Sequence, residues 1–517
     1  MRPQPTRCLL LLVDGLRPDV AEERLASGLL PNLAAMLRSG GRTRAITVFP
    51  STTSVAYLPF LTGCTPGRCN IPSIRWLDRR VYGGRWWRDR AGVRSYCGYQ
   101  APLLDSDIAP DVRTMFDLVP GSVGIFTPIA RGLSAGGDPA RRERQAWGAL
   151  AHYAQWHQPS DDAVARHLLR AADGPARFIF AQFPAVDGYS HQSTPDSPTV
   201  RRALQRVDAT LGQVRALLQR RGELERTLIL VVSDHGATEV HTHLDLAQWF
   251  RDHGVPTLSH PVTWERKPRA AVMVAGNGSA MVYAQPNLRR QERWPVERLR
   301  QPDAFGSGTD LVAALIAEPA VALVAGESPD GGVWLGSSVG SALIRRAAGD
   351  ISYRPLEGDP LALGGARNGS ERDWLDSTWD AELPDAAYHL LDQFRAGRAG
   401  DLLVVAREGY DFRARFEVPE HRSGHGSLIR GHMQTPVWTS EPLPAAPLRT
   451  VDLFPAMADW LDVPLPEGID GAPVWLPGAH VRRDQLGRAA LSAADRAAPR
   501  AQAASIRLSC IPQPGSG

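Results

Sequence analysis

The chain has 517 residues, of which 22% are charged, and its formal net charge is only +3 at pH 7. That length is enough for a large core, and the charge balance excludes the strongly basic surface of a dedicated nucleic-acid-binding protein. Five cysteines without regular spacing argue against a disulfide framework and for a reducing compartment. No stretch approaches twenty apolar residues, so we expect a cytoplasmic protein without a transmembrane segment.

Continuous apolar runs alternate with helical patterns along the chain. The runs predict strands that are buried on both faces, and they lie at 8–13, 177–183, 227–233 and 401–407. Helices are predicted at 31–38 and at 200–222, where leucines and valines recur at helical spacing before Gly222. This alternation predicts an α/β fold with a central, mostly parallel sheet flanked by helices.

The pattern changes in the second half of the chain. From about Gly254 to Gly400 it consists of short strand-like runs with many prolines and glycines, and long helical patterns are missing. We interpret 254–400 as an inserted cap or lid subdomain, and 1–253 together with 401–488 as the catalytic core. The final residues, 489–517, are rich in Ala, Arg, Pro and Ser without a sustained apolar face, which predicts a flexible tail.

Carboxylates and imidazoles follow the predicted strands, where an open α/β sheet collects its functional groups. These side chains are Asp14, Asp187, His191, Asp234, His235 and His425. Such a mixture suits zinc, with manganese or iron as alternatives, and its distribution over two clusters suits a pair of divalent metal ions. His421 and His432 are alternative ligands, but the two glycines that flank His425 favour that residue.

The stretch FPSTTSVAYLPFLTG at 49–63 has four consecutive hydroxyl side chains before an apolar run that predicts a helix. A hydroxyl is a poor nucleophile at neutral pH unless a metal lowers its pKa, and a helix N-terminus further favours the alkoxide. Ser51 and Thr52 are candidate caps of that helix. The residues alone leave open which hydroxyl is a nucleophile.

These motifs resemble the alkaline phosphatase superfamily, and within it the nucleotide pyrophosphatase/phosphodiesterase (type I phosphodiesterase) branch. The shared motifs are VDGLRPD, FPSTT followed by LTG, D-G-x-x-H at 187–191, SDHG, GHG and the C-terminal segment 449–471. The resemblance implies an alkaline-phosphatase-like core with two metal ions. It assigns one ion to Asp14, Thr53, Asp234 and His235, and the other to Asp187, His191 and His425. The spacing to LTG makes Thr53 the implied covalent nucleophile.

The chain departs from that branch after LTG, where relatives usually continue with a His-Gly pair and later an asparagine that holds a phosphoryl oxygen. Here the stretch 67–72 lacks the histidine, so Asn70 and Arg75 are the candidate substrate-binding residues. Cys64 begins a C-x-P-x-R pattern that resembles the sulfatase signature. In sulfatases the pattern precedes LTG rather than following it, so we predict that Cys64 is a small buried residue.

The resemblance implies a two-metal hydrolase that cleaves phosphate diesters or pyrophosphates through a phosphothreonine intermediate, with nucleotides among the candidate substrates. A phosphomonoesterase, a phosphonate hydrolase and a phosphomutase are alternatives on the same site, because the fold and the metals do not fix the leaving group. A metal-binding protein without catalysis is an alternative from another class. The expected partner is a small phosphate ester, and the sequence does not give the oligomeric state.

Overall fold

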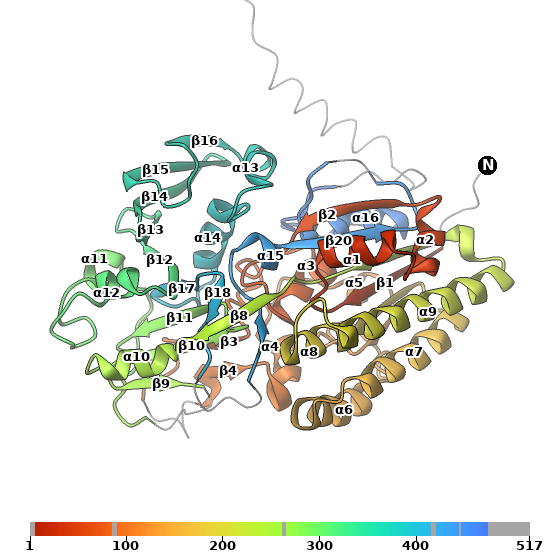
Figure 1. Cartoon of the computed structure of the whole chain (residues 1–517), viewed down its shortest axis with the longest axis horizontal. Helices are drawn as coiled ribbons and strands as arrows, with labels where there is room; N and C mark the ends of the chain where they lie inside the picture. Colours follow the sequence, from red (N-terminus) through yellow and green to blue (C-terminus); the bar gives the residue numbers. More distant parts are fainter. Residues whose placement is uncertain (1–5, 85–89, 261–264, 415–419, 444–445, 474–517) are drawn as a thin grey trace, which may run out of the picture. The chain divides into compact units, whose positions relative to one another are not determined.

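The computed structural model describes residues 6–473, except 85–89, 261–264, 415–419 and 444–445. The tail predicted at 489–517 lies outside these residues. Two large sheets organise the described part of the chain, one with six strands and one with nine (Figure 1). None of the helices in this part combines the length and apolarity that a bilayer crossing requires. The cytoplasmic location stays a prediction.

The six-stranded sheet has the order β2-β20-β7-β1-β6-β5. Its strands are β1 (Arg7–Val13), β2 (Gly41–Ile46), β5 (Val123–Ile125), β6 (Phe178–Phe183), β7 (Thr227–Val232) and β20 (Gln434–Thr439). Strand β1 pairs in parallel with β6 and β7, and β5 pairs in parallel with β6, whereas β20 and β2 are antiparallel. Every residue of β1, β6 and β7 is buried, as continuous apolar runs predict.

Helices cover both faces of this sheet. Successive strand residues point to opposite sides, so each strand packs against both layers of helices. On the face of Leu9 and Leu11 the core includes α1 (Pro18–Ala26), α2 (Pro31–Leu37), α7 (Gln158–Asp173) and α9 (Pro198–Arg220). On the face of Leu10 and Leu12 it includes α3 (Leu58–Thr62), α5 (Met115–Leu118) and α16 (Leu453–Trp460). The α/β prediction is confirmed, and α2 and α9 lie where their patterns predict.

The nine-stranded sheet has the order β16-β15-β14-β13-β12-β17-β11-β10-β9 and is antiparallel except for the pair β9 and β10. Its strands are β9 (Thr257–Ser259), β10 (Ala270–Ala275), β11 (Ser279–Ala284), β12 (Val321–Glu327), β13 (Val333–Ser337), β14 (Gly340–Ala347), β15 (Asp350–Gly358), β16 (Arg367–Ser370) and β17 (Leu402–Ala406). The cores on its faces include α10 (Leu246–Asp252), α11 (Val296–Leu299) and α12 (Leu311–Ala317) on one side, and α13 (Glu371–Thr378) and α14 (Ala386–Arg395) on the other.

Strand β17 corrects one prediction. The apolar run at 401–407 was expected in the central sheet, but β17 pairs with β11 and β12 of the nine-stranded sheet. A continuous apolar run indicates a strand buried on both faces, and it carries no information about which sheet provides the neighbours. The boundaries predicted for the inserted subdomain remain a prediction.

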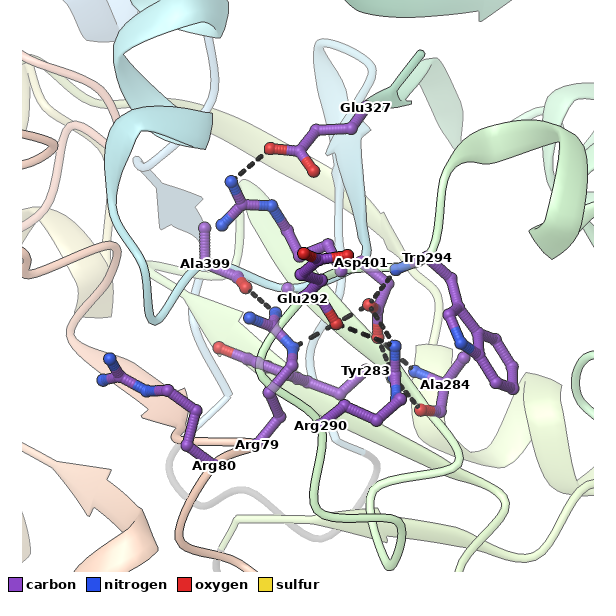
Figure 2. A network of polar contacts seen from close by, with 12 residues as sticks. Arg79, Arg80, Tyr283, Ala284, Arg290, Glu292, Trp294, Glu327, Ala399 and Asp401 are labelled. Carbon is purple, nitrogen blue, oxygen red and sulfur yellow. Dashed lines mark hydrogen bonds and ion pairs between the residues drawn. The ribbon is translucent and has the colours of Figure 1, made fainter. Parts of the chain in front are cut away.

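A buried polar network precedes β17 (Figure 2). Asp401 is fully buried, accepts hydrogen bonds from two backbone N–H groups and pairs with the Arg290 guanidinium at 2.9 Å. Arg79, from the loop after β3 (Arg75–Leu77), donates to the carbonyls of Gly397, at 3.0 Å, and Ala399. The network therefore links the loop after β3 to the nine-stranded sheet. In sequence this loop follows α3, a helix that packs on the six-stranded sheet.

Candidate metal centre and nucleophile

Three parallel strands deliver the acidic side chains to one edge of the six-stranded sheet. Asp14 follows β1 directly, and Asp234 is the second residue after β7. Asp187 lies in α8 (Ala185–Gln192), a helix that begins two residues after β6. Because β1 is in register with both neighbours, the three strand ends meet, and all three carboxylates are buried there.

Two groups of side chains bring their ligand atoms within 4.8 Å of one another: Asp14, Asp234 and His235, and Asp187, His235 and His425. His191 joins the second group, because its Nε2 lies 3.2 Å from Asp187 Oδ2 and its ring lies 5.1 Å from the ring of His425. The structure thus brings together all six predicted carboxylate and imidazole residues. The division between two metals stays a prediction, and His235 lies in both groups.

The three imidazoles are held in the same way. In each ring Nδ1 donates to a backbone carbonyl. His191 donates to Ser423 at 2.8 Å, His235 to Gly236 at 3.1 Å, and His425 to Ser51 at 3.0 Å. A carbonyl accepts but never donates, so each bond fixes a proton on Nδ1. Nε2 of each ring is then the nitrogen that is left for a metal ion.

The acidic groups repel one another in this buried position. Burial and the Asp234 charge raise the pKa of Asp14 well above its usual value, and burial and Asp187 raise the pKa of Asp234 to about 8. Asp187 forms an ion pair instead. Burial disfavours both charges of that pair, but their attraction dominates, lowering the pKa of Asp187 and raising the pKa of His191 to about 9.

The residues present fit a pair of divalent cations. Asp187 Oδ1 and Asp234 Oδ2 are buried and have no hydrogen-bond partner among the described residues. Buried carboxylate oxygens without partners are costly, and divalent cations held by these carboxylates would remove that cost and the repulsion among the acidic groups. Carboxylate oxygens with imidazole nitrogens are donors that zinc, manganese and iron accept.

Thr53 lies beside the first group. Its Oγ1 is 3.2 Å from His235 Nε2 and 3.4 Å from Asp14 Oδ1. The next residue, Ser54, has a φ of +72°, which side-chain-bearing residues rarely adopt, and the chain turns there into the helical segment η1 (Val55–Tyr57) and α3. A helical segment follows Thr53 as predicted, beginning as a 3₁₀ turn.

The predicted helix cap is wrong. The capping position is Ser54, whose side chain makes no capping bond. Ser51 Oγ instead donates to the carbonyl of Ser427 at 3.0 Å, and Thr52 Oγ1 is buried without a hydrogen-bond partner among the described residues. Ser51 is used by a tertiary contact that local sequence does not indicate.

The two candidate substrate-binding residues make no hydrogen bond or ion pair with the ligand groups in the described part of the chain. Asn70 Oδ1 accepts from the backbone N–H of Arg398 at 3.2 Å. Arg75 Nη1 donates to the carbonyl of Val274, in β10, at 3.2 Å. Their roles stay predictions, and the first contact gives Asn70 a structural role.

Of the two alternative ligands, His432 is engaged in other hydrogen bonds and His421 lies beside the site. His432 Nδ1 accepts from the N–H of Ser427 at 3.0 Å, and its Nε2 lies 2.9 Å from Thr238 Oγ1. Burial lowers the pKa of His432 to about 3, so it stays neutral. The His421 ring stacks on the ring of His191 at 4.3 Å. Cys64 is buried, as predicted.

Two residues that hold Asp14 were missed by sequence reasoning. Tyr57 Oη and Gln182 Nε2 both donate to Asp14 Oδ2, at 3.1 and 2.7 Å. Both are buried. With Oδ2 occupied, Oδ1 is the oxygen that faces Thr53 and His235. A glutamine within the otherwise apolar run FIFAQF was the available signal, since a buried polar side chain needs a partner.

The six-stranded sheet thus has helices on both faces and a cluster of buried carboxylates and imidazoles at one edge. Residues 8–301, more than half of the chain, match the family described as type I phosphodiesterase/nucleotide pyrophosphatase. The chain belongs to this family, as the resemblance implied, and the family indicates a hydrolase that acts on phosphate esters.

Two solved structures are similar in fold. Murine ectonucleotide pyrophosphatase/phosphodiesterase 5, as an inactive threonine-to-alanine variant in complex with AMP, gives a TM-score of 0.53 at 14% identity, over 91% of this chain and 98% of that chain. Phosphonoacetate hydrolase from Sinorhizobium meliloti, in complex with phosphonoacetate, gives 0.52 at 15% identity, over 88% and 95%. These similarities confirm the alkaline-phosphatase-like fold. No curated protein matches the chain.

Proposed function

We propose that this protein is a two-metal hydrolase that cleaves phosphate diesters or pyrophosphates, with Thr53 as the covalent nucleophile. The observation that carries the proposal is the position of Thr53 Oγ1, 3.2 Å from His235 Nε2 and 3.4 Å from Asp14 Oδ1. One ion is assigned to Asp14, Thr53, Asp234 and His235, and the other to Asp187, His191 and His425. Zinc is the first candidate, followed by manganese and iron.

When bound, the cations would lower the pKa of the Thr53 hydroxyl and neutralise charge on the phosphoryl oxygens. Thr53 Oγ1, after losing its proton to solvent, attacks phosphorus. The bond to the leaving oxygen breaks, and that oxygen keeps the electron pair and takes a proton from water. Water then attacks the phosphothreonine, the bond between phosphorus and Oγ1 breaks, and Thr53 regains a proton.

The likeness to phosphonoacetate hydrolase makes a phosphonate hydrolase the second candidate. AMP in the mouse structure makes nucleotides the first substrates to test. We retain Arg75 as the candidate contact for a phosphoryl oxygen, because its Nε is buried without a hydrogen-bond partner among the described residues, and its anchor Val274 is close in sequence to the turn beside His425. The fold alone does not set the leaving group.

The test compares wild type, Thr53→Ala and Thr52→Val after metal loading. The substrates are bis-p-nitrophenyl phosphate, p-nitrophenyl phosphate, a nucleotide p-nitrophenyl ester and phosphonoacetate, and metal content is measured for each protein. Thr53→Ala should lower diester turnover about a thousandfold or more while both metals remain. Thr52→Val, which removes the neighbouring hydroxyl at nearly constant volume, should keep most activity. Equal activity of Thr53→Ala and wild type would refute the nucleophile, and turnover of phosphonoacetate alone would select the second candidate.

A further inference from the structure

The loop that carries His425 is held on one side by the nucleophile segment. Ser51 makes three hydrogen bonds to it. Its carbonyl accepts from His425 Nδ1 at 3.0 Å, its Oγ donates to the carbonyl of Ser427 at 3.0 Å, and the same Oγ accepts from the N–H of Gly426 at 3.2 Å. The loop therefore cannot move without breaking contacts to the residues that precede Thr53.

On its other side the loop rests on the turn between β10 and β11 of the nine-stranded sheet. The N–H of Gly278 donates to the carbonyl of His425 at 2.8 Å, and the N–H of His425 donates to the carbonyl of Gly276 at 3.3 Å. Ser279 Oγ donates to the carbonyl of Gly426 at 2.7 Å. Both backbone groups of His425 are thus paired with this turn, in an isolated β-bridge to Asn277.

The turn approaches so closely because positions 276 and 278 are glycines. A Cβ added to Gly276 would lie 2.5 Å from His425 Nδ1, and one added to Gly278 would lie 2.4 Å from the His425 carbonyl oxygen. Gly276 also has a φ of +52°, which favours glycine. A side chain at position 276 would push against the nitrogen that bonds to Ser51.

The sheet that presents this turn is itself anchored. Ser427 Oγ donates to the carbonyl of Ala406, the last residue of β17, at 3.0 Å. Asp401, just before β17, is fixed by Arg79 and Arg290 in the network of Figure 2. The described residues of both large sheets belong to one compact unit.

We propose that the turn Gly276–Ser279 is a positioning element for His425, so that the nine-stranded sheet is a fixed part of the metal centre rather than a lid above it. The inference rests on the proposed function in one respect, the role of His425 as a metal ligand. Gly276 acts through His425 and Ser279 through the neighbouring Gly426, and neither has a part in the chemistry itself.

The first readout is metal affinity, measured by chelator competition on Gly276→Ala, Ser279→Ala and the control Gly331→Ala. Gly331 lies in the turn between β12 and β13 with a φ of +84° and has nothing within 4 Å of an added Cβ, so it matches the backbone strain without the contact. Gly276→Ala should weaken one of the two metal positions about 10- to 100-fold and leave the other unchanged. Ser279→Ala should weaken the same position less, and Gly331→Ala should weaken neither.

The second readout needs no metal. Hydrogen exchange of the backbone amides at 424–427, measured on metal-free protein, should accelerate in Gly276→Ala and Ser279→Ala but not in Gly331→Ala. Unchanged exchange and unchanged affinity in both turn variants would overturn the inference. If Gly276→Ala does not fold, as judged by its unfolding transition, Ser279→Ala decides alone. If the wild type binds no metal, but its amides at 424–427 still exchange more slowly than those of the two turn variants, the proposed function is refuted. The turn then remains the support of the His425 loop.

Discussion

The two ligand groups differ in what supports them. Asp14, Asp234 and His235 follow adjacent parallel strands of one sheet, so strand register places them. The second group combines α8, which carries Asp187, with a loop that is enclosed between Ser51 and the turn of the other sheet. Register is a property of neighbouring strands, whereas the second arrangement depends on contacts between segments far apart in the sequence. The second group should therefore respond more strongly to changes outside the site.

Removing the shared ligand should erase the difference between the groups and have the largest effect. Because His235 belongs to both groups, His235→Ala should lower the bound metal from two ions to less than one. Turnover should fall about a thousandfold. Metal analysis after gel filtration measures the number of bound ions. The control is His241→Ala, because His241 is an exposed histidine of β8 (Thr238–His243). Two ions bound to His235→Ala with wild-type affinity would contradict the assignment.

The supports of Asp14 allow the first group to be weakened alone. Tyr57→Phe and Gln182→Leu each remove one hydrogen bond to Asp14 Oδ2 at similar side-chain volume. Each should lower the affinity of the first metal position about tenfold, since partners that orient a ligand contribute to metal binding.

Chelator competition again gives the affinities of both positions. Tyr353, in β15 of the nine-stranded sheet, donates its hydroxyl to Asp359. Tyr353→Phe therefore controls for the general effect of losing a buried hydroxyl. A loss of affinity at the second position instead would mean that the two groups are not supported separately.

The last prediction concerns the helix of the second group and is a pH dependence of stability rather than a change in metal binding. Asp161, in α7, accepts the N–H of Ala185 at 3.1 Å, and α8 has no capping side chain of its own. Burial raises the pKa of Asp161 from 3.8 to about 8. Between pH 3.8 and about pH 8 the folded protein holds a proton on Asp161 that the unfolded chain has released. The free energy of unfolding therefore decreases as the pH rises through this range.

Asp161→Asn keeps the acceptor and cannot ionise. The free energy of unfolding of the variant, relative to wild type, should therefore increase from about pH 5 to about pH 8. Urea unfolding of metal-free protein at several pH values measures it. Parallel pH curves for the two proteins would show that Asp161 does not titrate in this range.

Sequence reasoning worked best where a residue's place follows from its own strand. Asp14 and Asp234 could be predicted because each comes after a continuous apolar run, and parallel strands end at the same edge. It failed where the neighbour of a strand, or the hydrogen-bond partner of a side chain, is determined by tertiary packing. The run at 401–407 read as a central strand, and Ser51 read as a helix cap, although its actual partners stand more than 370 positions later. Neither local pattern nor propensity encodes such contacts.

The position of β1 between β6 and β7 has a consequence for the growing chain on the ribosome. Strand β1 lacks its neighbour β6 until residue 183 has been synthesised and its neighbour β7 until residue 232 has been synthesised, so the apolar run 8–13 is fully paired only after that point. The first ligand group is complete soon afterwards, and His425 follows only after the strands of the second sheet. Exposed apolar strands are prone to aggregate. The aggregation risk of this apolar run should therefore fall in two steps, when β6 and then β7 have been synthesised.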